Sequence, residues 1–326
     1  MGRRLFIAAV LLMLLMPVAL MPFHADMPSH QAQSALTVDN VGEHLALRTA
    51  LITWRDRLLS LIGESGNDQV IRGRGMLFYD QEIPDYLGLS ALPEAELTDL
   101  ADMLARLNDA LSAEDRRLIV LLAPNKSSVY PEAMPARCLP ADKPSNLTRL
   151  QAALTERGVS CLDAQAVLLA GKEQGQLYYA HDTHWNARGA WLVYGALMDQ
   201  MGLPVPYEDV SFEDGQAGDL IIMAQPGTSP VEPDAVPGIQ RTYRTARPMR
   251  SLNDMRIETT SPADTPSLLV IRDSFGEGLF PYLANSIGKL VYSRVYADAL
   301  SQARTAEADI VIIEIVERNI PVLNIE

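Results

Sequence analysis

The fold is decided by the stretch Leu268-Leu-Val-Ile-Arg-Asp-Ser-Phe-Gly276, where a continuous apolar run changes into a polar turn. Three other runs share this apolar character: Leu118-Ile-Val-Leu-Leu-Ala123, Leu290-Val-Tyr292 and Ile310-Val-Ile-Ile-Glu-Ile-Val316. Continuous rather than alternating hydrophobicity is typical of strands buried on both faces of a parallel sheet. Helical patterns fall between several of these runs, at 146–157, 187–201, 279–287 and 299–307. This alternation predicts an α/β fold with a mostly parallel sheet.

The regions around these runs predict the remaining organisation. Helical spacing of apolar residues continues at 40–62 and 94–111, which we expect to be amphipathic helices. Residues 204–266 hold nine of the chain's 21 prolines and are predicted to form an insertion. We therefore expect one domain over 39–326, with that insertion inside it.

The N-terminus predicts export. Arg3 and Arg4 precede a charge-free stretch at 5–23 that is long enough to approach the thickness of a bilayer core. We interpret residues 1–23 as an uncleaved signal anchor, with a cleaved signal peptide as the alternative, and residues 24–38 as a linker. The rest of the chain is then periplasmic and tethered to the inner membrane.

The composition is that of a globular protein with an acidic surface. The 326 residues are 48% hydrophobic, and 27 Lys and Arg against 41 Asp and Glu give a net charge of -14. Such a surface repels phosphate backbones, and no basic run with interleaved aromatic residues offsets that repulsion. Nucleic acid is therefore excluded as an expected partner.

The two cysteines, Cys138 and Cys161, are predicted to form a disulfide. In an oxidising compartment an isolated pair of cysteines is more typical of a disulfide than of half a metal site. Two buried free thiols are the alternative.

Ser274 is the first candidate for chemistry. It lies at a predicted turn from strand to helix, where its hydroxyl is exposed at the sheet edge and the helix N-terminus can stabilise an oxyanion. The alternative is an ordinary N-cap serine.

The segment Asp182-Thr-His184-Trp185 is the second candidate. Two residues apart in an extended segment, Asp182 and His184 point to the same side, so the carboxylate can orient the imidazole as a general base. A metal site formed by His181 and His184, or two surface histidines, are the alternatives. We predict no metal, because no further Cys or His cluster accompanies them.

Five blocks of the sequence together resemble the AlgX/AlgJ group of SGNH-hydrolase-like proteins, also called DHHW proteins. They lie in the expected order between about residues 40 and 320: Gly75-Met-Leu-Phe-Tyr79, Ala123-Pro-Asn-Lys126-Ser-Ser-Val-Tyr130-Pro-Glu, Asp182-Thr-His184-Trp185, Arg272-Asp-Ser274-Phe275-Gly276 and Ile315-Val-Glu-Arg318-Asn319.

The resemblance implies an SGNH-hydrolase-like, flavodoxin-like three-layer sandwich with circularly permuted motif order, because the Asp/His block precedes the serine block. It implies a Ser274-His184-Asp182 triad that transfers acetyl groups to hydroxyls of an exopolysaccharide such as alginate, without a cofactor. A membrane-bound O-acyltransferase is implied as the acetyl donor. A polysaccharide acetylesterase and a non-catalytic subunit of a secretion complex are the alternatives. By the same resemblance, the candidates for contacts to the oxyanion or substrate are Arg318, Asn319, Lys126, Trp185 and Arg272.

Within the predicted insertion, arginines are concentrated in an otherwise acidic chain. We call Arg241, Arg244, Arg247 and Arg250 the arginine strip; Arg256 follows it. The strip is interpreted either as a solvated loop or as a binding surface for an anionic polymer.

Overall fold

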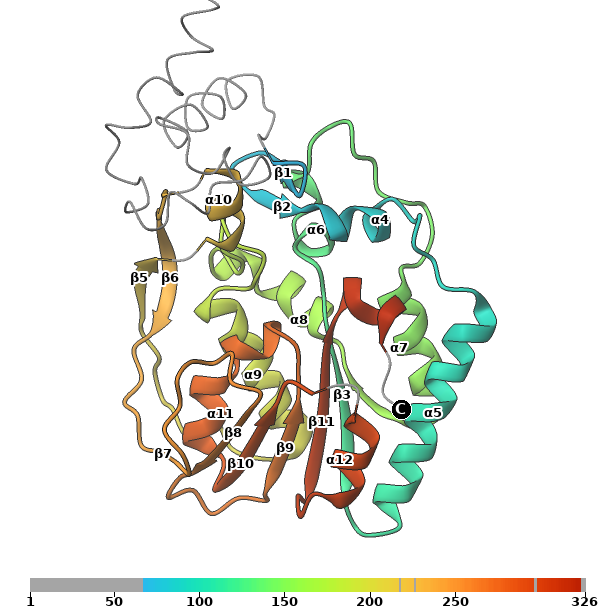
Figure 1. The fold of residues 1–326 in the computed structure, drawn as a ribbon, viewed down its shortest axis with the longest axis vertical. Coiled ribbons are helices and arrows are strands. Elements are labelled where there is room, and N and C mark those ends of the chain that lie inside the picture. Colours follow the sequence, from blue (N-terminus) through green and yellow to red (C-terminus); the bar gives the residue numbers. More distant parts are fainter. Residues whose placement is uncertain (1–66, 217, 226, 296–297, 324–326) are drawn as a thin grey trace, which may run out of the picture. The chain divides into compact units, whose positions relative to one another are not determined.

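The protein is described by a computed structural model that covers residues 67–323 except 217, 226 and 296–297 (Figure 1). The predicted anchor at 1–23, the linker at 24–38 and the helix at 40–62 lie outside the described residues. In the part of the chain that is described, no helix is both long and apolar enough to cross a membrane.

A seven-stranded sheet forms the centre of the fold (Figure 1). Its strands are β3 (Arg117–Ala123), β4 (Ser160–Leu162), β7 (Arg244–Thr245), β8 (Arg256–Thr260), β9 (Leu268–Ile271), β10 (Lys289–Ser293) and β11 (Ile310–Val316). The strand order is β4-β3-β11-β9-β10-β8-β7, and the first five strands are parallel. The four apolar runs are therefore confirmed as strands of a mostly parallel sheet.

Both faces of this sheet are covered by helices, which confirms the three-layer arrangement. Along β3, Ile119 and Leu121 contribute to one core, while Val120 and Leu122 contribute to the other. The first core includes α8 (Ala164–Gly171), α9 (Ala187–Met201) and α11 (Phe280–Ser286); the second includes α5 (Glu94–Ser112), α7 (Asn146–Glu156) and α12 (Ala299–Thr305). Burial on both faces is why these strands read as unbroken apolar runs.

Local capping explains where the helices begin and end. The Ser145 side chain accepts a hydrogen bond from the Thr148 N–H at the start of α7. Asn186 caps α9 in the same way through the Gly189 N–H. Gly202 ends α9 in the left-handed conformation, with φ 73°.

The predicted insertion contributes to the central sheet. Within 204–266, β8 runs antiparallel to both of its neighbours, β10 and β7. Alternate residues of β8 are buried, as expected for a strand near a sheet edge. The earlier part of the insertion forms the hairpin β5 (Phe212–Gln216) and β6 (Val231–Pro237) with α10 (Asp219–Ala224) between its strands.

Shorter elements complete the described chain. A hairpin of β1 (Val70–Arg72) and β2 (Leu77–Tyr79) precedes α4 (Ile83–Tyr86), and α6 (Lys126–Val129) follows β3. None of these was predicted, because each is too short to show a period in the sequence.

The predicted disulfide is wrong, because Cys138 and Cys161 are both free thiols. Cys161 packs against the core that contains α5 and α7, whereas Cys138 packs against the core on the other face of the sheet. A disulfide requires Cβ atoms within about 4.5 Å. The packing of the two side chains against different cores agrees with the free thiols.

We expect alkylation of the native, unreduced protein to label both thiols, Cys138 before Cys161. Burial, and then the charge of Asp163, raise the pKa of Cys161 to about 12, and the thiolate is the reactive form. Timed iodoacetamide labelling with peptide mass spectrometry gives the order, with denatured protein as the control. Thiols that label only after reduction would contradict the free-cysteine arrangement.

Candidate active site

Ser274 lies at the carboxyl end of β9, in the middle of the sheet, and begins the 3₁₀ helix Phe275–Gly278. Two carboxyl groups hold this turn. Asp273 Oδ1 accepts a hydrogen bond from the Phe275 N–H at 2.9 Å. Glu314 Oε2 on β11 accepts from the N–H groups of Asp273 at 3.0 Å and Gly276 at 3.1 Å. The hydroxyl of Ser274 is thus fixed at the carboxyl ends of the parallel strands, where ligands bind in such folds.

The two carboxyl groups also join β9 to β11. Asp273 Oδ2 accepts hydrogen bonds from the Val316 N–H at 2.8 Å and from Asn319 Nδ2 at 3.2 Å. Glu314 is completely buried; burial, and next the charge of Asp273, raise its pKa well above the usual range. Burial and the neighbouring carboxyl group therefore favour the protonated form of Glu314.

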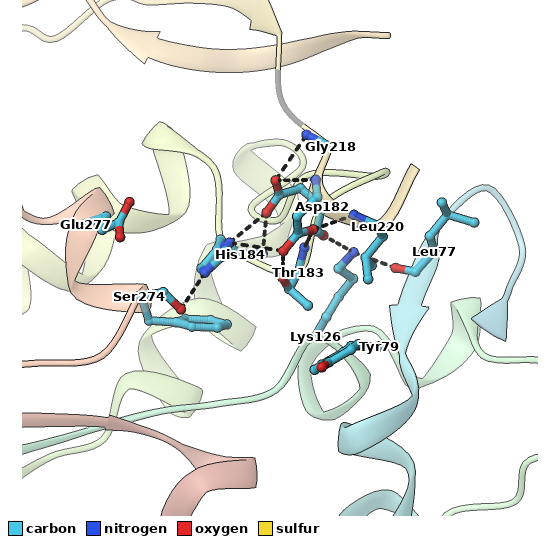
Figure 2. Close-up of polar contacts among 12 residues, drawn as sticks. Leu77, Tyr79, Lys126, Asp182, Thr183, His184, Gly218, Leu220, Ser274 and Glu277 are labelled. Atoms are coloured by element: carbon cyan, nitrogen blue, oxygen red, sulfur yellow. Dashed lines mark hydrogen bonds and ion pairs between the residues drawn. The ribbon is translucent and has the colours of Figure 1, made fainter. Parts of the chain in front are cut away.

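His184 joins Ser274 to Asp182 (Figure 2). Its Nε2 lies 2.8 Å from Ser274 Oγ, and its Nδ1 lies 2.7 Å from Asp182 Oδ1. The segment from Asp182 to Trp185 ends at Asn186, the N-cap of α9, so that helix fixes the path of the segment. These are the contacts that a serine nucleophile, a general base and an orienting carboxylate require.

A loop of the insertion holds the second oxygen of Asp182. Asp182 Oδ2 accepts from the N–H groups of Gly218 at 3.0 Å and Asp219 at 2.9 Å. Gly218 has φ 147°, and a Cβ there would lie 2.4 Å from Ile221 Cγ2. A glycine is therefore required to bring these two donors to the carboxylate.

The charges of the site favour an ionised Asp182 and a basic His184. Burial alone would raise the pKa of Asp182, but the hydrogen bond and charge of His184 hold it well below the usual range. Burial alone would lower the pKa of His184, but Asp182, with Asp219, raises it above the ordinary histidine value. His184 is thereby made a stronger base toward the Ser274 hydroxyl.

Asp219 is a second carboxylate at this site that the sequence did not predict. Its Oδ2 lies 3.8 Å from His184 Nδ1 and accepts the hydroxyl hydrogen of Thr183, while its Oδ1 accepts the Thr183 N–H at 2.8 Å. Burial, and next the charge of Asp182, raise the pKa of Asp219. No local pattern marks Asp219, because it approaches His184 only after the insertion folds back over the triad.

Asp219→Asn is expected to move the acidic limb of the pH profile of kcat/KM to lower pH. The charge of Asp219 helps raise the pKa of His184, so its removal lets His184 lose its proton at lower pH. The plateau rate should change by less than about tenfold, because the backbone donors to Asp182 are retained. Asp214→Asn, at an exposed position of β5, is the matched control. An acidic limb that stays in place would contradict this role of Asp219.

Asp182, His184 and Asp219 are the one group of described residues whose possible ligand atoms lie close enough together for a metal, within 4.8 Å of one another. Hydrogen bonds already engage these atoms, since His184 contacts Asp182 and Ser274, and Asp219 contacts Thr183. His181 does not join His184; its Nδ1 instead lies 2.7 Å from Glu232 Oε1. The pattern fits a triad better than a metal site.

A cleft of about 440 Å³ opens beside Ser274 and His184. Trp185 lines it, and the Trp185 ring packs against the Phe275 ring with centroids 5.1 Å apart. The insertion supplies part of its lining, including Tyr243, Met249 and Leu252. The predicted insertion therefore forms part of the candidate site.

Lys126 and Arg272, which the resemblance implied as contacts to the oxyanion or substrate, are only 1% exposed and do not line the cleft. Lys126 Nζ donates to the carbonyl oxygens of Leu77 at 2.6 Å and Asp182 at 2.5 Å, on the side of Asp182 away from Ser274 (Figure 2). Arg272 Nη1 donates to Glu277 Oε1 at 3.2 Å, and its guanidinium lies over the Tyr292 ring. Both support the site from outside the cleft.

The structure places the remaining predicted residues around the turn or on the insertion. Asn319 binds Asp273, and the Arg318 guanidinium lies 5.2 Å from the ring centroid of Phe275 and 5.6 Å from that of Tyr79. The arginine strip is outside the cleft lining; Arg241 lies over the Tyr243 ring at 4.4 Å.

Residues 70–286 match the family described as "SGNH hydrolase-like domain, acetyltransferase AlgX". The "Probable alginate O-acetylase AlgJ" of Pseudomonas syringae pv. tomato is 29% identical over 130 residues, which are 38% of this chain and 31% of that protein. The protein of the same name from Azotobacter vinelandii is 26% identical over 145 residues, 44% of this chain and 36% of that protein. The matched regions thus span about a third of the length of these relatives.

Solved structures show the same fold. The O-acetyltransferase domain of Pseudomonas putida AlgJ superposes with a TM-score of 0.52 and 19% identity, over 78% of this chain and 93% of that chain. PatB1 of Bacillus cereus superposes with a TM-score of 0.57 and 16% identity, over 78% and 97% of the two chains. At these identities the likeness concerns the fold alone.

Proposed function

This chain belongs to the family of SGNH hydrolase-like AlgX acetyltransferase domains, and on that basis we propose that it is an exported O-acetyltransferase that modifies hydroxyls of an exopolysaccharide. One observation carries the proposal: His184 is hydrogen-bonded to both Asp182 and Ser274, at 2.7 and 2.8 Å, at the edge of an open cleft. The names of the AlgJ relatives, which refer to alginate, support a polysaccharide acceptor.

The reaction proceeds in two steps with Ser274 as the acetyl carrier. In the first step His184 Nε2 takes the Ser274 proton, Oγ attacks the acetyl carbonyl of the donor, and the protonated His184 returns that proton to the departing donor oxygen. In the second step a sugar hydroxyl gives its proton to His184 and attacks acetyl-Ser274, which releases the ester and reprotonates Ser274. Asp182 keeps the imidazole oriented and stabilises its charged form throughout.

The Ser274 N–H is the proposed oxyanion donor. It has no hydrogen-bond acceptor among the described residues, whereas the N–H groups of Phe275 and Gly276 are engaged by Asp273 and Glu314. A free donor at the turn can bind the negative oxygen that forms during either step.

The acetyl donor is proposed to be a membrane-bound O-acyltransferase. Residues 1–23 carry the basic flank and charge-free stretch of an export segment, so we place the domain in the periplasm, tethered to the inner membrane. Acetyl-CoA does not reach that compartment, and a membrane protein must therefore supply the acetyl group.

The experiment follows the fate of acetyl groups from an activated acetyl ester. The purified protein is incubated with 4-nitrophenyl acetate and neutral or acidic oligosaccharides, and acetylated sugar and free acetate are measured by mass spectrometry. Sugar acetylation that requires Ser274 supports the transferase. Release of acetate alone at every sugar concentration would make the protein an acetylesterase, and no turnover by folded protein would indicate a non-catalytic subunit.

A further inference from the structure

The cleft beside Ser274 is walled by apolar and aromatic side chains. Tyr243, Met249 and Leu252 come from the segment between β6 and β8, and Phe280 comes from α11. The Tyr243 and Phe280 rings meet edge to face, with centroids 5.5 Å apart and planes at 83°. Such walls fit the C–H face of a pyranose ring, with a few polar groups to orient its hydroxyls.

The charged groups that line the cleft, besides His184, are carboxylates. Asp182 is saturated by its hydrogen bonds to His184, Gly218 and Asp219. Glu277 has a side chain 28% exposed, and both of its ion pairs use Oε1, with Arg272 at 3.2 Å and Arg294 at 3.8 Å. Its Oε2 has no partner in the described part of the chain and can accept a hydrogen bond from a hydroxyl.

Figure 2 shows where Glu277 lies relative to the triad. Glu277 is on the other side of His184 from Asp182, on the side of Ser274. It belongs to the 3₁₀ helix that Ser274 begins, and it lines the same cleft. Glu277 is therefore available to a sugar that occupies the cleft beside Ser274.

No described residue that lines the cleft is a lysine or arginine. Several arginines near it are engaged by other groups. Arg272 is buried against Glu277 and Tyr292, Arg294 donates to Asn253, and Arg188 is paired with Asp234 at 2.7 Å. Arg241 lies over the Tyr243 ring and donates to the Tyr243 carbonyl oxygen at 3.3 Å.

A uronate is a poor ligand for such a cleft. Its carboxylate would lose water without meeting a lysine or arginine of the cleft lining, and it would face the carboxylate of Glu277. A neutral sugar has no such cost, and its hydroxyls are the donors that Glu277 Oε2 requires. We propose that the acceptor of this chain is an uncharged hexose unit of a polysaccharide, with Glu277 as the residue that discriminates against uronates; this proposal rests on the transferase function.

The test uses pairs of ligands that differ only in the carboxyl group. Oligomannuronate is compared with the oligomannoside obtained from it by carboxyl reduction, and an oligoglucuronate with its reduced oligoglucoside. Binding to Ser274→Ala protein is measured by titration calorimetry, so that no turnover is required. A neutral member of these pairs is expected to bind at least about tenfold more tightly than its uronate, a difference of about 1.4 kcal/mol.

Two variants identify the cause of the preference. Glu277→Gln keeps a hydrogen-bond acceptor and removes the charge, so the difference in affinity between each uronate and its reduced partner should become smaller. Arg304→Gln, at an exposed position of α12, is the matched control and should leave the difference in affinity unchanged.

The proposal is overturned if the uronates bind as tightly as their reduced partners, if neither neutral ligand binds, or if a preference for uronates disappears in Arg241→Gln. A different result would show that the transferase function is wrong. In that case the wild-type protein never carries acetyl on Ser274 after exposure to an acetyl ester without sugar, whatever the order of sugar affinities.

Discussion

Ser274→Ala and His184→Ala are each expected to lower kcat for acetyl turnover by about a thousandfold or more, and the double variant should be little worse than either single one. The reason is geometric. His184 Nε2 lies 2.8 Å from Ser274 Oγ, so each residue acts only through the other. Turnover of an activated acetyl ester, measured with and without sugar, gives the three values.

A matched control separates this loss from damage to the fold. Ser301→Ala changes an exposed serine on α12 and should leave turnover unchanged. Thermal unfolding of each variant shows whether the domain is intact. Losses that multiply in the double variant would contradict a shared step, because independent contributions add as free energies.

Asp182→Asn extends the same prediction. The substitution removes the charge that stabilises protonated His184 and allows the imidazole to adopt the wrong tautomer, so turnover should fall strongly while the fold is kept. In the wild type, kcat/KM should fall as the pH drops through the pKa of His184, which lies above the ordinary histidine value.

Lys126→Met is expected to destabilise the folded state by about 3–5 kcal/mol. Lys126 is 1% exposed, and its ammonium group joins β2 to the triad segment through the carbonyl oxygens of Leu77 and Asp182. Burial lowers the pKa of Lys126 to about 8, and the nearby carboxylates Glu82 and Asp182 partly offset that effect. Removing the cation leaves these buried groups uncompensated.

Denaturant unfolding of the variant gives the change in the free energy of unfolding. Lys143→Met, at an exposed position, is the matched control and should change that free energy by less than about 0.5 kcal/mol. A Lys126 variant as stable as this control would show that the two carbonyl oxygens are satisfied in another way.

The elements that the sequence predicted are those whose hydrophobic pattern continues over many consecutive residues. β3, β9, β10 and β11 were predictable because both faces are buried, and α5 and α9 because their apolar spacing runs over several turns. β7 and β8 were not, because they are short, partly exposed and lie among prolines.

The candidate site divides in the same way. Asp182 and His184 were recognisable because they are two residues apart, and Ser274 because it follows a strand. Asp219 approaches His184 from 35 positions along the chain, and Glu314 is a single acid inside an apolar strand, so neither has a local signal. The disulfide prediction was wrong for a related reason, because the spacing of two cysteines along the chain does not show which core each side chain enters.

Mass spectrometry of the intact protein after brief exposure to 4-nitrophenyl acetate shows directly whether Ser274 carries acetyl. We expect a gain of one acetyl group, located on Ser274 by peptide mapping, absent in Ser274→Ala and strongly reduced in His184→Ala. Addition of a sugar acceptor should then remove the acetyl group and place it on the sugar. A well-folded protein that gains no acetyl group at Ser274, or gains it equally without His184, would contradict a catalytic triad of Ser274, His184 and Asp182.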